Sequence, residues 1–116
     1  MKYWYLASPY SQYPGGLDEA ASVAARNAGL LIAAGVHVYS PIAHSHVIAM
    51  HTPLDPRDYG VWMPLNHAMM RVARGLIVLR MPGWATSEGV TMEREAFAGR
   101  RIVMMDPGVV PSALFT

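Results

Sequence analysis

Four short apolar runs, each followed within two residues by a proline, alternate along the chain with segments of helical periodicity. The runs cover residues 3–7, 36–39, 76–81 and 101–105. Runs of this length are typical of buried strands, and parallel strands need a helical crossover between them. The order β-α-β-α-β-α-β therefore predicts a three-layer α/β/α domain with a four- or five-stranded parallel sheet, in the flavodoxin-like order 2-1-3-4(-5).

The first helix is the clearest element between two strands. It begins at or just before Asp18, repeats alanine, leucine and isoleucine at helical spacing, and closes at Gly35. The next segment, IAHSHVIAMH at 42–51, is compatible with a short helix or a loop. Residues 52–60 are rich in turn formers, and loops of this sort often cover binding sites.

Two further helices are predicted in the second half of the chain. Pro64 suits the first turn of a helix that reaches about Ala73, because a proline there loses no helical hydrogen bond. The last helix follows a glycine turn, with Thr86 or Ser87 as its N-cap, and ends at Gly99.

The composition fits one domain, residues 1–116, and constrains its partners. Charged residues make up 15% of the chain, below the roughly 25% of an average protein. Much of the surface must be uncharged, which indicates a subunit interface, and we expect a homo-oligomer, a dimer or tetramer. The net charge of +1 gives no electrostatic case for binding nucleic acid or an anionic membrane.

The chain contains no cysteine, which excludes disulfides, thiol catalysis and thiolate metal sites. Its start, MKYWYLASPY, is too short and too aromatic for a signal peptide. No apolar run approaches the roughly 20 residues of a membrane span. A cytoplasmic protein is therefore expected.

Glu93 is an acidic residue that the periodicity places on a buried face. If the last helix begins near Ser87, Val90 and Phe97 mark one apolar stripe, and Glu93 lies on it. A buried carboxylate is costly unless it is paired or used. Side chains lean toward the helix start, so the carboxyl should lie over Gly89, where a side chain is missing. An ion pair with a nearby arginine, serving only stability, is the alternative.

The carboxyl ends of parallel strands meet at one edge of a sheet, which is where open α/β sheets bind ligands. The residues that should gather there are Ser8, Pro9 and Tyr10, the segment 40–46, and the segment 82–89. The free N–H groups at the start of the last helix favour an anion such as a phosphate or carboxylate. This edge is therefore the expected site.

Familiar cofactor and metal motifs are absent from the sequence. There is no G-x-G-x-x-G after a strand, no G-x-x-x-x-G-K-[ST] and no G-x-S-x-G, so no cofactor is expected. His44, His46 and His51 invite a metal site, but H-x-H without a third ligand at fixed spacing is weak evidence. We expect no metal and instead interpret these imidazoles as hydrogen-bonding a ligand or lining a wet loop.

Three segments resemble the nucleoside 2-deoxyribosyltransferase superfamily, especially its short branch, which is related to nucleoside 5′-monophosphate N-glycosidases. They are YLASPY and YSPIAHSH, after the first two strands, and PGWATSEGVTMEREA after the third. The resemblance covers about residues 3–105 and implies the same fold, with the sugar held at the carboxyl ends of the strands. The last segment is the most specific.

The resemblance implies roles for individual residues. Glu93 matches the nucleophile, which must be ionised to attack a sugar, and a helix N-terminus favours that state. Tyr10 would orient the carboxylate, and Trp84 would shield the site or stack on a base, unless it is a buried loop anchor. The substrate-binding set implied in this way is Ser8, Pro9, Ser40, His44, His46, Trp84, Ser87 and Gly89.

Two positions depart from the family pattern. The family often has an aspartate where this chain has Asn66, and another acid where it has Arg74. An amide can hydrogen-bond a sugar or base but cannot donate a proton as a carboxylic acid does, so the leaving group would need another residue or water. A structural role for Asn66 in its helix is the alternative.

The sequence thus predicts an enzyme that cleaves or transfers the N-glycosidic bond of a nucleoside or nucleoside 5′-monophosphate. Its partner would be that small molecule and further copies of the chain, without nucleic acid or membrane. Two alternatives come from other classes: a catalytically silent nucleotide-binding module, and an oligomeric scaffold without a ligand.

Overall fold

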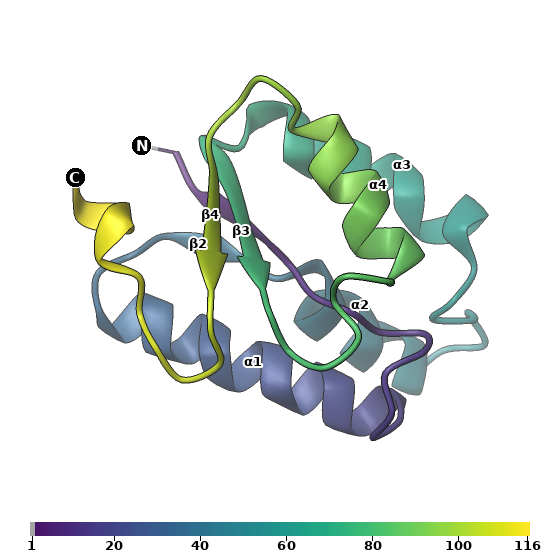
Figure 1. The fold of residues 1–116 in the computed structure, drawn as a ribbon. Helices are drawn as coiled ribbons and strands as arrows, with labels where there is room; N and C mark the ends of the chain where they lie inside the picture. Colours follow the sequence, from purple (N-terminus) through teal and green to yellow (C-terminus); the bar gives the residue numbers. More distant parts are fainter. Residues whose placement is uncertain (1) are drawn as a thin grey trace.

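The computed structural model describes residues 2–116 and contains one four-stranded sheet (Figure 1). Its strands are β1 (Trp4–Ala7), β2 (Val38–Tyr39), β3 (Gly75–Leu79) and β4 (Ile102–Met105). All neighbouring strands are parallel, in the order β2-β1-β3-β4. The predicted strand order and parallel sheet are confirmed, with four strands rather than five among the described residues.

Helices connect the strands in the predicted alternation. They are α1 (Leu17–Ala33), α2 (Pro41–Met50), α3 (Tyr59–Val72) and α4 (Glu88–Ala96), and a short 3₁₀ helix η1 (Ser112–Phe115) follows the last strand. The ambiguous segment at 42–51 is thus helical. Within residues 2–116, none of these helices combines the length and apolar character needed to cross a membrane.

The turn after α1 explains why β2 is shorter than its apolar run. Gly35 has a φ of +89°, and the Val36 N–H donates to the Leu31 carbonyl at 2.9 Å, while the Gly35 N–H donates to Ile32 at 3.0 Å. These two bonds form a Schellman motif. Because Val36 is used to close the helix, only Val38 and Tyr39 pair with β1.

The start of α3 differs from the prediction. Pro64 lies inside the helix rather than in its first turn, because Asp58 caps the helix six residues before Pro64. The Asp58 carboxylate accepts from the Gly60 N–H at 3.0 Å. The indole of Trp62 is buried and donates to the Asp55 carbonyl at 2.9 Å, which anchors the first turn. Capping and burial therefore outweigh the preference of proline for a helix start.

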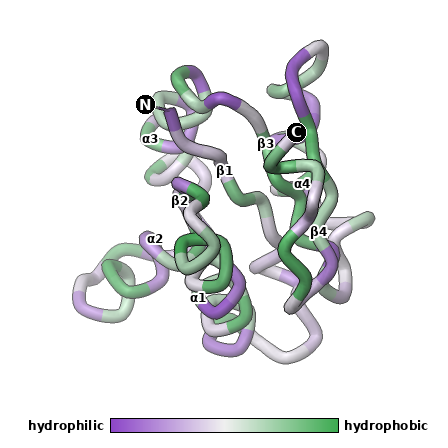
Figure 2. The backbone as a smooth tube through the Cα atoms, turned by 90° about the vertical axis from the view of Figure 1, so that its left-hand side faces the viewer, coloured by the Kyte–Doolittle hydropathy of each residue, from purple (hydrophilic) through white to green (hydrophobic). Residues whose placement is uncertain are grey.

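Two apolar clusters separate the three layers. On one face, Leu6 and Ile77 pack with Leu31 of α1 and Leu114 of η1. On the other face, Tyr5 and Val78 pack with α3 and α4 through residues such as Met70, Val90 and Phe97. Because both faces of the sheet are covered, β1 and β3 are apolar throughout. Figure 2 shows hydrophilic and hydrophobic stretches alternating along α1, as expected for a helix with one buried side.

Candidate active site

A pocket of about 150 Å³ lies at the carboxyl ends of the strands. Its walls come from the loop after β1, the first turns of α2 and α3, and the segment that leads into α4. The predicted edge of the sheet is therefore hollowed. Of the residues singled out from the sequence, the pocket is lined by Ser8, Pro9, Tyr10, Asn66, Ser87, Gly89 and Glu93.

Glu93 lies in the second turn of α4 with its side chain turned inward. The residue is 8% exposed and lines the pocket. The ion pairs found among residues 2–116 do not include it, so the alternative of an arginine partner is not what the structure shows. A carboxyl group is thus buried at a pocket wall without a compensating positive charge.

Burial sets the protonation state of this carboxyl. Loss of hydration raises the pKa of Glu93 from 4.5 to about 8, and a weak hydrogen-bonding interaction with Tyr5 opposes the rise. Burial therefore favours the protonated carboxyl, whereas the proposed attack on a sugar needs the ionised one. The helix dipole acts mainly within the first turn, and Glu93 lies beyond it, so burial prevails.

Tyr5 is the tyrosine next to the carboxyl, and sequence reasoning missed it. Its side chain is fully buried, and its hydroxyl lies beside Glu93 without completing a well-formed hydrogen bond. Burial and then the nearby carboxyl raise the pKa of Tyr5, so it stays protonated and can donate to an ionised Glu93. In the sequence Tyr5 is one of several aromatic residues in β1. Side chains alternate between the two faces of a strand, and only knowing which face α4 covers could have singled out Tyr5.

Three buried polar atoms around the pocket lack hydrogen-bond partners. They are the hydroxyls of Ser8 and Ser45 and the side-chain oxygen of Asn66. Ser8 is 4% and Ser45 7% exposed. Leaving such an atom unpaired costs about 1–3 kcal/mol, which a bound molecule with hydroxyl or amide groups would offset. The segment 40–46 expected at this edge includes Ser45, but the sequence singled out the histidines beside it, although the spacing of Ser45 from Pro41 places both on one helix face.

The start of α4 leaves open space next to the carboxyl. Ser87 is the N-cap and accepts from the Val90 N–H at 3.3 Å, which selects one of the two predicted caps. A methyl group added at Gly89 would lie 3.7 Å from the Tyr59 hydroxyl and 3.9 Å from the Ser87 hydroxyl, which is ordinary contact. Gly89 and Glu93 line the same pocket, and a methyl group at position 89 would be accommodated there.

Tyr59 and Glu88 complete this side of the pocket. Burial, followed by the charges of Glu88 and Glu93, raises the pKa of Tyr59, so its hydroxyl stays protonated close to both carboxyl groups. Tyr59 is the first residue of α3, and in the sequence it falls within the turn-rich residues 52–60, where no pattern distinguished it. The pocket therefore contains a proton donor that the sequence did not indicate.

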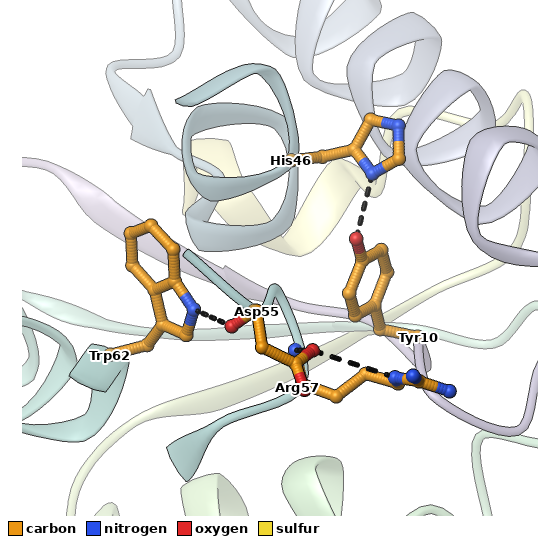
Figure 3. Close-up of polar contacts among 5 residues, drawn as sticks. All are labelled: Tyr10, His46, Asp55, Arg57 and Trp62. Atoms are coloured by element: carbon orange, nitrogen blue, oxygen red, sulfur yellow. Dashed lines mark hydrogen bonds and ion pairs between the residues drawn. The ribbon is translucent and has the colours of Figure 1, made fainter. Parts of the chain in front are cut away.

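The hydroxyl of Tyr10 does not serve Glu93. It is hydrogen-bonded to Nδ1 of His46 at 2.7 Å (Figure 3), and Nε2 of His46 is 2.8 Å from a carboxylate oxygen of Asp18. Tyr10 lines the pocket, but the His46 ring does not. His44 and His46 were expected at the wall of the pocket, but the residues of α2 that line it include Ile42 and Ser45 instead.

Three other predicted binding residues also lie outside the pocket wall. Ser40 caps α2 by accepting from the Ala43 N–H at 3.2 Å. His44 is exposed, with its ring 5.7 Å from that of Tyr39. Trp84 packs on the second apolar cluster, and the Arg94 guanidinium lies 5.4 Å from its ring centre. The anchoring role that was the alternative for Trp84 agrees with this position.

No metal site is evident in the part of the chain that the structure describes. Within residues 2–116, no three histidine, aspartate or glutamate side chains converge on one point. The chemistry available at the pocket is therefore that of a buried carboxyl group, tyrosine hydroxyls and unpaired hydroxyl and amide oxygens.

A Rossmann-like parallel α/β protein with a pocket at the carboxyl ends of its strands is the class that this fold and site define. Within that class, the chain belongs to the family described as "Domain of unknown function (DUF1937)", whose model matches residues 2–106. The match includes every residue that we have placed at the pocket. No curated protein matches the chain.

Proposed function

We propose that this protein cleaves or transfers the N-glycosidic bond of a nucleoside or nucleoside 5′-monophosphate, with Glu93 as the nucleophile. The observation that carries the proposal is a carboxyl group buried in a pocket wall without a positively charged partner. Burying such a group is costly, and active sites are where proteins retain groups of this kind. The resemblance of the three strand-end segments to nucleoside 2-deoxyribosyltransferases supplies the reaction class.

The reaction would proceed through a covalent intermediate. The Glu93 carboxylate attacks C1′ of the sugar, the bond from C1′ to the base nitrogen breaks, and the base leaves with the bonding electrons and takes up a proton. Water or a second base then attacks C1′ and releases the carboxylate, so that the configuration at C1′ is retained. Tyr5 can donate a hydrogen bond to the carboxylate that attacks and is released.

The unpaired atoms of the pocket suit the polar groups of a nucleoside. Ser8, Ser45 and Asn66 offer a hydroxyl, a second hydroxyl and an amide to the sugar hydroxyls or the base. The first turn of α4, beside Gly89, offers backbone N–H groups to the 5′ hydroxyl or a 5′-phosphate. A nucleoside would thus bind with its C1′ close to Glu93.

Proton delivery to the leaving base cannot come from Asn66. Besides Glu93, the hydroxyl of Tyr59 is a proton donor at the pocket, and water is the other source. The hydroxyl of Tyr59 is well placed, because it lies near Gly89 and both carboxyl groups.

The test is incubation with a panel of deoxy- and ribonucleosides and their 5′-monophosphates, with free base measured by chromatography. A slow substrate with fluorine at C2′ should leave a sugar adduct on Glu93 that intact mass and peptide mapping detect. Glu93→Gln is expected to give neither base nor adduct. Glu95→Gln, which removes an exposed carboxylate from the same helix, is the matched control and should retain both.

A catalytically silent nucleotide-binding module is the second candidate. It is favoured by the amide at Asn66 and by the burial of Glu93, which raises the pKa of its carboxyl and favours the protonated form. It predicts that nucleotides raise the melting temperature without release of base at any pH. Release of base that depends on Glu93 would eliminate it.

A further inference from the structure

Three side chains from different elements form a hydrogen-bonded chain at the back of the pocket. Tyr10 follows β1, His46 lies in α2, and Asp18 lies in the first turn of α1. The hydroxyl of Tyr10 is 2.7 Å from Nδ1 of His46, and Nε2 of His46 is 2.8 Å from Asp18. The Asp18 side chain is 84% exposed, whereas that of His46 is 12% exposed. The chain thus runs from the surface to a residue of the pocket wall.

The positions of the protons follow from the partners. An ionised carboxylate only accepts, so the nitrogen that faces Asp18, Nε2, must carry a hydrogen. In a neutral imidazole the other nitrogen, Nδ1, is then bare and must accept from the Tyr10 hydroxyl. Burial raises the pKa of Tyr10, which keeps that hydroxyl protonated.

We propose that Asp18 and His46 are positioning residues that hold the ring of Tyr10 as a preformed wall of the pocket. In this arrangement the single hydroxyl proton of Tyr10 is committed to His46. Tyr10 therefore presents a bound molecule with its ring and an oxygen lone pair, and donates no proton to it or to Glu93. That the bound molecule is a nucleoside rests on the proposed function, whereas the hydrogen-bonded chain does not.

Other charged groups near Tyr10 do not replace Asp18. Asp55 and Arg57 lie near the other end of the Tyr10 side chain (Figure 3) and pair with each other at 3.6 Å. His44, on the same helix as His46, is exposed and contacts Tyr39 instead. Asp18 is therefore the acidic group that fixes the His46 ring.

Fixing a wall before binding reduces the ordering that binding requires. Without Asp18, the His46 ring can adopt its other tautomer, which presents an N–H to Tyr10 and removes the acceptor of its hydroxyl. The bond would then reverse, with Nδ1–H donating to the Tyr10 oxygen, and a His46 ring no longer held by Asp18 would attach the loop at residues 9–12 to α2 less firmly. The consequence should be weaker binding, with the chemical step at Glu93 unaffected.

The experiment compares Asp18→Asn with Glu19→Gln, which removes the neighbouring exposed carboxylate that faces Arg26 at 3.6 Å. Long-range ¹H–¹⁵N spectra of the wild-type protein at pH 8 should show His46 protonated at Nε2 and bare at Nδ1. Asp18→Asn should give a mixture of tautomers, and faster hydrogen–deuterium exchange in the peptide that contains residues 9–12. Glu19→Gln should change neither.

A third readout uses the nucleoside 5′-monophosphate panel and calorimetry in the Glu93→Gln background. Asp18→Asn should raise Kd about fivefold, the effect of losing one ordered hydrogen bond, and Glu19→Gln less than about twofold. A proton on Nδ1 of wild-type His46, or equal exchange at residues 9–12 in both variants, would overturn the proposal. If no panel compound binds the wild-type chain, the proposed function fails, and the spectra and exchange rates still decide the role of Asp18.

Discussion

Replacing Glu93 by glutamine should make the protein more stable, by an amount that grows with pH. The folded state holds the proton of Glu93 with a pKa of about 8, whereas an unfolded glutamate has a pKa of about 4.5. Below both values the carboxyl is protonated in both states and contributes no difference. Between them the unfolded state releases a proton that the folded state keeps, so stability falls as the pH rises.

The size of the effect follows from the same two pKa values. Their difference, at 1.36 kcal/mol per pH unit, corresponds to about 5 kcal/mol of lost stability above pH 8, and to about 2–3 kcal/mol between pH 5 and pH 7. Glutamine cannot ionise, so the variant avoids this loss. The free energy of unfolding of Glu93→Gln relative to wild type should therefore rise steadily from pH 5 to pH 8 and level off above it.

Urea unfolding, repeated at each pH unit from 5 to 9, measures the free energy of unfolding of both proteins. Because the two share all other titratable groups, the difference between their free energies isolates the effect of Glu93. Glu95→Gln is the control, because its side chain is exposed and its difference from wild type should stay constant. A constant difference for Glu93→Gln as well would show that the carboxyl ionises as readily in the folded chain as in the unfolded one. Burial would then not control the protonation of Glu93.

Four further predictions concern the same pocket. The kcat/KM for base release should rise about tenfold per pH unit from pH 6 and level off near pH 8, as the carboxylate forms; a flat profile from pH 6 to pH 9 would contradict this. Tyr5→Phe removes the group that lowers the pKa of Glu93, so the midpoint of that profile should move to higher pH, which a stopped assay across pH can detect. Gly89→Ala should fold normally and gain up to about 1 kcal/mol in a melting experiment, since alanine favours helix and meets no close contact, while binding nucleotides more weakly. Tyr59→Phe should lower kcat/KM about tenfold with little change in melting temperature; an unchanged rate would remove Tyr59 as the proton donor.

The fold could be read from the sequence because its signals are local. Apolar runs ended by prolines and one long amphipathic segment determine the alternation of strands and helices, and the crossover rule then limits the topology. The inward position of Glu93 and the gap at Gly89 follow from helical spacing within a single element. These features agree with the structure because they do not depend on how distant segments pack.

The remainder of the site depends on packing between elements. Ser45 and Tyr59 reach the pocket, and Tyr5 reaches Glu93, only because separate helices and strands meet there, and no spacing along the chain indicates that meeting. The protonation of Glu93 depends on how completely neighbouring layers exclude water. The bond from Tyr10 to His46 likewise joins residues 36 positions apart and engages a hydroxyl that the family resemblance had implied for Glu93.

The two sides of the pocket are carried by separately connected parts of the chain. The Glu93 carboxyl lies on α4, the helix that follows β3, while Ser45 and Asn66 lie on α2 and α3, which are joined by irregular residues 51–58. Changes in the length or composition of that linker would shift one side and leave the other in register. We expect libraries randomised at 51–58 to yield variants with exchanged ligand preference, which a design confined to α4 would not reach.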